Sequence, residues 1–169
     1  MSWDKEIDEL HHRGTLAEAM GGADKVARQH EFGKLTIRER VDAIVDPGSF
    51  HEVGKLAGVG QYDNDGNLVS FTPSNYIFGT AEIDGRAVMI SGDDFTVRGG
   101  SADASIGAKR MQAEGLALEL GLPHIRLVDG MGGGGSVKTI ETAGRTYIPQ
   151  IAGWDTIVGH LGVAPSVSL

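Results

Sequence analysis

Residues 76–91 read YIFGTAEIDGRAVMIS, and this stretch decides the fold. Two runs rich in β-forming residues, Tyr76 to Ile83 and Arg86 to Ser91, flank Asp84-Gly85, a dipeptide typical of a two-residue type I′ turn. The sequence therefore predicts a β-hairpin, whose second strand leads into the next segment of the chain.

A helix and another strand are predicted after this hairpin. Ser101 is suited to cap a helix over residues 102–120, which is closed by Gly121 and Pro123. Residues 124–128 are predicted to form a short buried strand, so that residues 86–128 would make a βαβ unit with a right-handed crossover and an α/β fold. The inward face of the helix would carry Ile106, Ala113, Leu116, Ala117 and Leu120.

Upstream of the hairpin, residues 3–29 are predicted to be helical, with breaks at Gly14 and at Gly21-Gly22. Thr36 and Glu39 have the spacing of a capping box, which begins a short helix that Asp46-Pro47-Gly48 ends. Its buried stripe would be Ile37, Val41, Ile44 and Val45. We expect residues 1–32 to form a helical amino-terminal arm and residues 33–169 to form one domain.

The remaining segments carry weaker patterns. Residues 54–75 predict a loop or irregular hairpin, and residues 139–147 and 151–160 are compatible with helices. Residues 163–169 have strand character and no polar tail, from which we expect a chain cut within a sheet.

Composition excludes several classes of function. A net charge of −8 with 15 Lys and Arg disfavours nucleic acid, and the cluster of Lys25, Arg28, Lys34, Arg38 and Arg40 is best interpreted as a solvated helix face. The absence of cysteine removes disulfides, thiolate nucleophiles and cysteine-ligated metals, and the six histidines lack metal-site spacing, so no metal is predicted. No apolar run approaches the ~20 residues of a membrane span, which predicts a cytoplasmic protein without membrane contact.

A glycine run, Gly130-Met131-Gly132-Gly133-Gly134-Gly135, follows the last strand of the βαβ unit. It satisfies G-x-G-x-x-G, the pattern of a dinucleotide-binding site. That pattern should follow the first strand of a βαβ unit, whereas this run follows the last strand, which disfavours a dinucleotide site. A phosphate loop fails at Val137, where that motif requires glycine, and a flexible surface turn also remains open. Backbone N–H groups in such a run can face a ligand directly.

Three segments, the last of which contains this glycine run, resemble acyl-CoA carboxylase β subunits, such as those of propionyl-CoA and methylcrotonyl-CoA carboxylases. They are residues 33–40 (GKLTIRER) followed by 46–52 (DPGSFHE), residues 94–101 (DFTVRGGS), and residues 129–135, which lie where the family has D-S-G-G-A-R. The resemblance implies a crotonase-like (ClpP/crotonase) fold of ββα repeats, incomplete here. This sequence departs from the family pattern by its extra glycines and by lacking the arginine.

The resemblance implies a carboxyltransferase that moves a carboxyl group from carboxybiotin to the α carbon of an acyl-CoA through a thioester enolate. Biotin would come from a biotin carboxyl carrier or biotin carboxylase subunit, and the enzyme would be a homo-oligomer, a hexamer in the family. Gly133 and Gly134 would be the catalytic amide donors to the thioester oxygen. The acyl-CoA would lie along Phe95, Thr96, Val97, Arg98, Gly99, Gly100 and Ser101, with Arg98 as the charge partner of a phosphate.

Several polar residues are interpreted as having structural and not functional roles. Asp93 and Asp94 are treated as a turn device, and His124 as the satisfied partner of a backbone carbonyl. Lys109 and Arg110 fit a helix surface, although they could reach CoA.

Two alternative functions stay open. One is a crotonase-like hydratase, isomerase or acyl-CoA decarboxylase, which should present a carboxylate to the thioester, for which the sequence names no obvious candidate. The other is a non-catalytic acyl-CoA-binding or assembly module. Because the family's second glycine pair would follow Leu169, we expect residues 1–169 alone to lack part of the catalytic site.

Overall fold

The computed structural model describes residues 2–101, 107–130, 140–141, 144 and 154–169. The helices are α1 (Asp4–Glu18), α2 (Ala23–Glu31), α3 (Ile37–Asp42), α4 (Gly107–Leu120) and α6 (Trp154–Leu161), with a 3-10 turn at Arg98–Gly100. The strands are β1 (His51–Glu52), β2 (Gly58–Tyr62), β3 (Leu68–Pro73), β4 (Tyr76–Ile83), β5 (Arg86–Asp93), β6 (His124–Leu127) and β7 (Ser166–Ser168).

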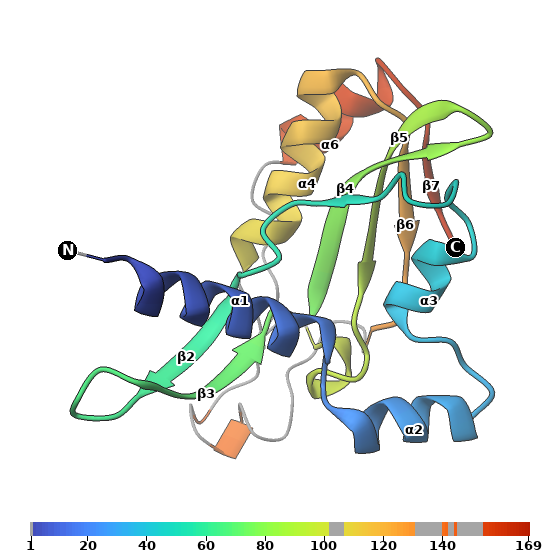
Figure 1. The fold of residues 1–169 in the computed structure, drawn as a ribbon. Coiled ribbons are helices and arrows are strands. Elements are labelled where there is room, and N and C mark those ends of the chain that lie inside the picture. Colours follow the sequence, from blue (N-terminus) through green and yellow to red (C-terminus); the bar gives the residue numbers. More distant parts are fainter. Residues whose placement is uncertain (1, 102–106, 131–139, 142–143, 145–153) are drawn as a thin grey trace.

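The central sheet contains five of these strands, in the order β1-β4-β5-β6-β7 (Figure 1). The pairs β1–β4 and β4–β5 are antiparallel, whereas β5–β6 and β6–β7 are parallel. Because parallel strands run in one direction, the segments that follow β5 and β6 leave the sheet at the same edge. The candidate site is built at this edge.

The hairpin predicted from residues 76–91 is present. β4 and β5 pair from Tyr76 with Asp93 to Ile83 with Arg86, which leaves a two-residue turn. Asp84 and Gly85 have φ angles of 50° and 69°, as a type I′ turn requires. The carboxylate of Asp46 accepts hydrogen bonds from both turn amides, at 3.0 and 2.8 Å.

The predicted strand, helix and strand are confirmed as β5, α4 and the parallel β6. Ala113 and Ala117 are fully buried on the inward face of α4, as predicted. Leu120 is half-exposed, so its predicted burial is wrong, because it is the last residue of the helix and the chain turns away at Gly121. The predicted helix start, including Ile106, lies outside the described residues.

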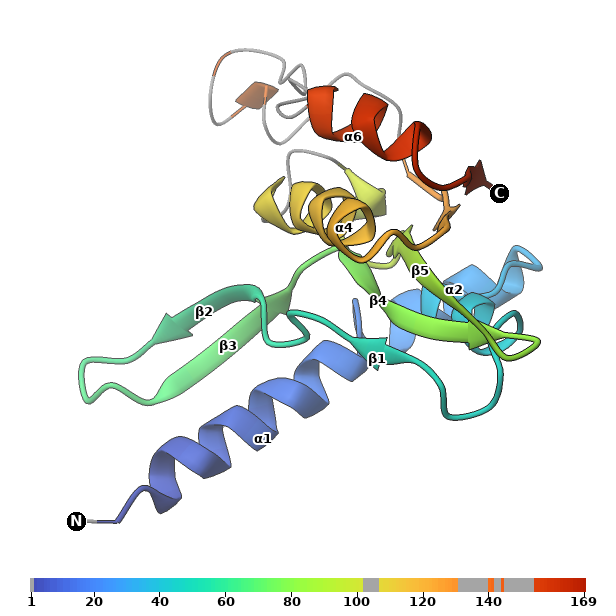
Figure 2. The same ribbon diagram turned by 90° about the horizontal axis from the view of Figure 1, so that it is seen from above.

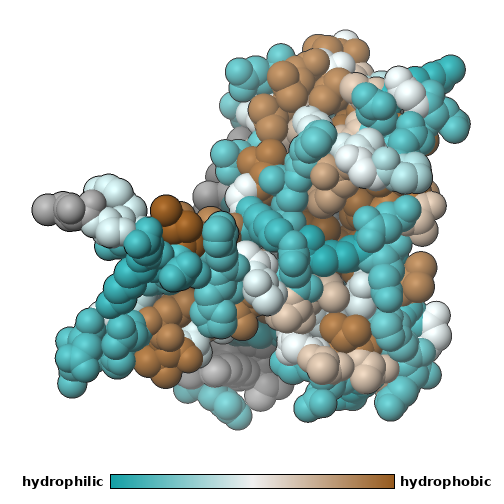
Figure 3. Space-filling model, viewed as in Figure 1, coloured by the Kyte–Doolittle hydropathy of each residue, from teal (hydrophilic) through white to brown (hydrophobic). Residues whose placement is uncertain are grey.

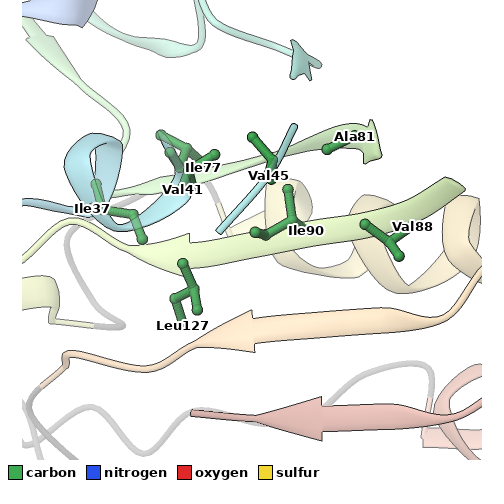
Figure 4. Close-up of a cluster of buried hydrophobic side chains, with 8 residues drawn as sticks. All are labelled: Ile37, Val41, Val45, Ile77, Ala81, Val88, Ile90 and Leu127. Atoms are coloured by element: carbon green, nitrogen blue, oxygen red, sulfur yellow. The ribbon is translucent and has the colours of Figure 1, made fainter. Parts of the chain in front are cut away.

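Two apolar clusters cover opposite faces of the sheet, so the body has three layers. The predicted stripe of α3 packs on one face, and eight side chains buried there are drawn in Figure 4: Ile37, Val41, Val45, Ile77, Ala81, Val88, Ile90 and Leu127. On the other face, α4 covers Tyr76, Phe78 and Met89. Figure 2 shows α4 and α6 together on that side. The alternation of side chains along β4 and β5 supplies both clusters.

The capping box predicted for α3 is confirmed. The Thr36 hydroxyl accepts from the amide of Glu39 at 3.3 Å, and the Glu39 carboxylate accepts from the amide of Thr36 at 2.7 Å. A hydrogen bond of 2.9 Å joins His30 at the end of α2 to the same carboxylate. The cap therefore fixes the start of α3 and also connects it to the preceding helix.

The amino-terminal arm differs in one respect from the prediction. α1 continues through Gly14, because a glycine inside a helix costs only about 1 kcal/mol, and the break comes at residues 19–22. α1 packs beside the irregular hairpin β2–β3, where the guanidinium of Arg13 lies 5.6 Å from the ring centre of Tyr62 and 5.5 Å from that of Phe71. Figure 1 shows α1 and this hairpin projecting together from the body.

The carboxyl-terminal region adds α6 and the edge strand β7. α6 packs against α4, and β7 confirms the strand character predicted for residues 163–169. Hydrophobic side chains gather over α4 and α6, whereas the α1 projection is largely hydrophilic (Figure 3). Most of the helix predicted at 139–147 lies outside the described residues. None of the helices in the described ranges combines the length and apolar character that crossing a membrane requires.

Candidate functional site

The loop after β5 is held by its own hydrogen bonds. Asp94 is buried, and its Oδ1 accepts from the amide and hydroxyl of Thr96 at 2.9 and 2.5 Å, which confirms the turn role predicted for this aspartate. The amides of Gly99 and Gly100 donate to carbonyls of the same loop. Their hydrogen bonds are therefore used within the loop, and ligand contacts depend on side chains.

The predicted CoA-binding segment divides into two layers. Phe95, Thr96, Arg98 and Gly99 line an open cavity, whereas three of its residues are buried beneath them: Val97, Gly100 and Ser101. Arg98, Gly99 and Gly100 have consecutive positive φ angles of 53°, 66° and 64°. This left-handed run turns the chain sharply at the cavity wall.

The same loop contacts the start of the glycine run that follows β6. A Cβ atom on Gly100 would come within 2.8 Å of the Asp129 carbonyl oxygen and 2.9 Å of the Gly130 Cα, so only glycine permits this approach. Gly133 and Gly134, the predicted amide donors, lie outside the described residues. Asp129 and Gly130 therefore mark where the predicted glycine turn begins.

The amino-terminal arm reaches the loop at the break between α1 and α2. The amide of Gly21 donates to Thr96 Oγ1 at 2.9 Å, and a Cβ atom on Gly21 would lie 2.1 Å from the Thr96 carbonyl oxygen. This contact places α2 opposite the loop and makes the second side of the cavity.

The cavity has a volume of about 650 Å³, within the range of small-molecule sites. Its described lining contains the cations Lys25, Arg28, Lys34 and Arg98, the aromatic residues Phe32 and Phe95, and Gln29, Thr96 and Gly99. No described lining residue is acidic, although the chain as a whole carries a net charge of −8. The site is therefore suited to a ligand with anionic groups and a flat ring.

The basic cluster seen in the sequence is only partly a solvated face. Lys25 and Arg28 are exposed as that interpretation requires, but they line the same cavity as Lys34. Arg38 instead pairs with Glu52 at 2.9 Å, and Arg40 donates to the carbonyl of Val128 at 3.4 Å. Spacing along the chain could not separate these roles, because α2 and α3 meet at an angle that the sequence does not specify.

A junction at Asp129 joins the cavity wall to the start of the glycine run. Its Oδ2 accepts from Gln29 Nε2 at 2.9 Å, and its Oδ1 accepts from Lys34 Nζ at 3.1 Å. Lys34 Nζ also lies 5.3 Å from the ring centre of Phe95. Gln29 is 5% exposed on α2, and no signal in the sequence indicates its role because nothing marks its partner 100 residues away.

Two ion pairs join cations of α4 to the sheet. Arg110 pairs with Asp93 and stacks over Tyr76, 4.8 Å from the ring centre, and burial raises the pKa of Asp93 against the pull of this arginine. Lys109 is 4% exposed and lies 3.6 Å from Glu52, and burial lowers its pKa. The surface placement predicted for Lys109 is therefore wrong, because the ion pair with β1 draws it inward.

His124 is satisfied, as predicted, but by side chains and not by a backbone carbonyl. Its Nε2 lies 2.8 Å from Ser91 Oγ and its Nδ1 lies 3.1 Å from Glu114 Oε2. These residue types also occur in nucleophilic triads. Because Ser91 and His124 are both fully buried, no substrate can reach the hydroxyl, and the chain of hydrogen bonds is a core element that ties β5, β6 and α4 together.

Across the described residues, no group of three or more His, Asp or Glu side chains converges in a way that could hold a metal ion. The described lining of the cavity offers a ligand cations, aromatic rings and neutral polar side chains.

Comparison with known proteins relates the chain to one family. The model of the carboxyl transferase domain matches residues 28–156. The propionyl-CoA carboxylase carboxyltransferase subunit of Haloferax mediterranei is 32% identical over 163 residues, covering 90% of this chain and 32% of that protein. The methylmalonyl-CoA decarboxylase subunit alpha of Veillonella parvula is 30% identical over 159 residues, covering 88% of this chain and 31% of that protein.

A solved structure agrees with these relatives. Transcarboxylase 12S, a hexamer with methylmalonyl-coenzyme A and methylmalonic acid bound, superimposes with a TM-score of 0.63 at 26% identity, covering 96% of this chain and 29% of the other. The fold is therefore the crotonase-like fold of carboxyltransferases. The chain spans about a third of the length of the curated relatives that it matches.

Proposed function

The chain belongs to the carboxyl transferase domain family, and from this premise we propose that it forms the acyl-CoA side of a biotin-dependent carboxyltransferase. In this proposal the cavity between α2 and the Phe95 loop holds the nucleotide end of the acyl-CoA. The thioester lies toward the glycine run, where the amides of Gly133 and Gly134 stabilise the enolate oxygen.

The observation that carries the proposal is the clustering of cations on the cavity wall. Lys25, Arg28, Lys34 and Arg98 come from the arm, from the α2–α3 connection and from the loop after β5, yet they line one cavity. CoA carries a pyrophosphate and a 3′-phosphate beside an adenine ring. Such anions pair with lysine and arginine, and the exposed face of Phe95 offers a surface for the ring.

The residues of this chain would bind and orient, and they would not act as acid or base. Phosphate contacts on the cavity wall fix the nucleotide, and the rigid loop and the Asp129 junction fix the path toward the glycine run. Pre-positioned amide donors at a developing oxyanion contribute several kcal/mol in such sites, so no side-chain base on this chain is needed for the enolate.

Biotin, when bound to a partner, would supply the carboxyl group and the ureido nitrogen that accepts the α proton. We assign no described residue to it, and propose that it arrives on a biotin carboxyl carrier or biotin carboxylase subunit. A homo-oligomer, a hexamer as in transcarboxylase 12S, and a cytoplasmic location belong to the same proposal. So does the division into an arm at residues 1–32 and an acyl-CoA-binding domain at residues 33–169.

Isothermal titration with CoA, dephospho-CoA and pantetheine tests the proposal. We expect CoA to bind at least about tenfold more tightly than dephospho-CoA, because a hydrogen bond to a charged group is worth about 1.5–3 kcal/mol. Arg98→Ala should weaken CoA and leave pantetheine unchanged. The matched control is Arg86→Ala, an exposed arginine at the opposite end of β5. Equal affinities for CoA and dephospho-CoA would contradict the proposal.

The relative from Veillonella parvula favours a second candidate, an acyl-CoA decarboxylase component. Removal of a carboxylate from a malonyl-type thioester passes through the same enolate in the reverse direction, so the same amide donors would serve both reactions. The two candidates differ in which substrate the assembled enzyme consumes. Carbon-14 in the free carboxylate of methylmalonyl-CoA should appear as carbon dioxide without added ATP if decarboxylation is the reaction.

A further inference from the structure

Asp129 joins the cavity wall to the start of the glycine run. Resting on the proposed function, we propose that Asp129 is a positioning residue through which the nucleotide end of the site acts on the start of the glycine run. The ligand it responds to is a nucleotide phosphate in the cavity lined by Lys34.

The side chain of Asp129 is held by the cavity wall at both oxygens. Gln29, from α2, donates to Oδ2 at 2.9 Å, and Lys34, from the segment before α3, donates to Oδ1 at 3.1 Å. Gln29 is buried, so its amide group would lose a buried hydrogen bond if Asp129 moved away. Gln29 and Lys34 therefore hold one carboxylate at the residue just before the glycine run.

The backbone of Asp129 also has contacts, with the segment that follows β5. Its N–H donates to the carboxylate of Asp93, which Arg110 of α4 fixes in turn. Its carbonyl and the neighbouring Gly130 pack against Gly100, where no side chain could fit. Contacts with the α2–α3 region, with Asp93 and with Gly100 leave residue 129 little freedom, and the position of Gly130 depends on them.

Lys34 is shared between two neighbouring cavities. It lines the 650 Å³ cavity together with the other cations, and it lines a second cavity of about 400 Å³ that also contains Asp129 and Arg40. Its ammonium can pair with a ligand phosphate or with Asp129. Because one compact charge serves both partners, pairing with the phosphate weakens the ion pair with Asp129, and the ion pair with Asp129 weakens phosphate binding. A phosphate in the larger cavity would therefore loosen one of the two side-chain contacts of Asp129.

This competition fixes the direction of a mutational effect. Asp129→Asn removes the internal counterion of Lys34, so phosphate binding should become tighter by roughly two- to fivefold, the range of an exposed ion pair. Lys34 has a side chain that is 52% exposed, so the gain should vanish at high salt. Damage to the fold would instead weaken binding.

The wild-type chain provides the main test. Adenosine 3′,5′-bisphosphate contains the nucleotide phosphate but no thioester, so any change that it causes at residue 130 must be transmitted through the protein. We expect its addition to shift the backbone amide NMR signals of Asp129 and Gly130. In Asp129→Asn the ligand should bind more tightly and the shift at Gly130 should shrink.

Asp24→Asn is the matched control, because it removes one negative charge from α2 without touching the cavity lining. Its effect on affinity should stay below that of Asp129→Asn. If the bisphosphate binds while the Gly130 signal stays fixed, or if Asp129→Asn weakens binding, the inference is wrong and the proposed function stands. If neither the bisphosphate nor CoA binds the wild-type chain, the proposed function itself fails.

Discussion

The amide of Gly21 donates a hydrogen bond to Thr96 Oγ1 over 2.9 Å, so the break between α1 and α2 rests directly on the loop that lines the cavity. Gly21→Ala should disturb this contact, because the new Cβ would lie 2.1 Å from the Thr96 carbonyl oxygen. We expect the unfolding free energy to fall by about 1–3 kcal/mol, or α2 to be displaced with weaker CoA binding. Urea unfolding and calorimetric titration measure the two effects.

Gly14→Ala is the control for Gly21→Ala. Gly14 lies inside α1, and a Cβ there would meet its nearest neighbour at an ordinary 3.9 Å. This change should stabilise the chain by about 0.5–1 kcal/mol and leave CoA affinity unaltered. Similar effects at both glycines would contradict the contact between Gly21 and the loop.

The charges of the cavity predict a strong dependence of binding on salt. CoA affinity should fall by about tenfold between 0.02 and 0.5 M NaCl, because exposed cations such as Lys25 are screened. Lys25→Ala should lower both the affinity at low salt and the steepness of this fall. Lys5→Ala, an exposed lysine on α1, should change neither. A flat salt profile would mean that phosphate pairing does not hold the ligand.

The buried contacts of His124 predict a stability effect without a binding effect. His124→Ala would leave Ser91 and Glu114 without their partner in the core and open a cavity, so we expect about 3 kcal/mol of lost unfolding free energy. CoA affinity of the folded fraction should not change. His51→Ala, at an exposed position of β1, should cost less than about 0.5 kcal/mol. An effect of His124→Ala on affinity alone would assign this histidine to the site.

The cap of α3 predicts an acid-sensitive contribution to stability. A hydrogen bond from His30, together with bonds from Thr36, lowers the pKa of Glu39 from 4.5 to about 2. The folded chain therefore binds this proton less readily than the unfolded chain, and the stabilisation is complete above about pH 4.5 and is lost as the pH falls toward 2. The difference in unfolding free energy between wild type and Glu39→Gln should shrink over this interval. Thr36→Ala should reduce this dependence of the unfolding free energy on pH, and it should lower the unfolding free energy by about 1 kcal/mol at neutral pH.

Local signals predicted much of the fold. The Asp84-Gly85 turn, the capping box at Thr36 and the strand, helix and strand from β5 to β6 each depend on residues close together in the sequence, and each is present. The errors at Gly14 and Leu120 concern where a helix breaks or buries its last turn. The packing of α1 against the β2–β3 hairpin supports the helix through Gly14, and the exit of the chain from α4 exposes Leu120. The periodicity of one helix encodes neither of these contacts.

The site was predicted in part. The Phe95 loop was identified by resemblance, and four of its residues line the cavity. The contribution of α2 was missed, because charges on a helix are usually solvated and because Gln29 meets a partner 100 residues away. Lys109 was misplaced for a related reason, since its buried pairing with Glu52 joins α4 to β1. Contacts between segments that are far apart in the sequence produce no periodic pattern from which they could be predicted.

The left-handed run at Arg98, Gly99 and Gly100 implies a conflict between folding and recognition at one residue. Glycine adopts this conformation without steric penalty, whereas an arginine there costs about 1–2 kcal/mol. A glycine at position 98 would relieve that backbone strain and remove the guanidinium from the cavity. The chain thus retains a locally unfavourable residue at the point where an anion would be held. Fold stability is lower as a result and anion affinity higher, as is often the case where proteins bind their substrates.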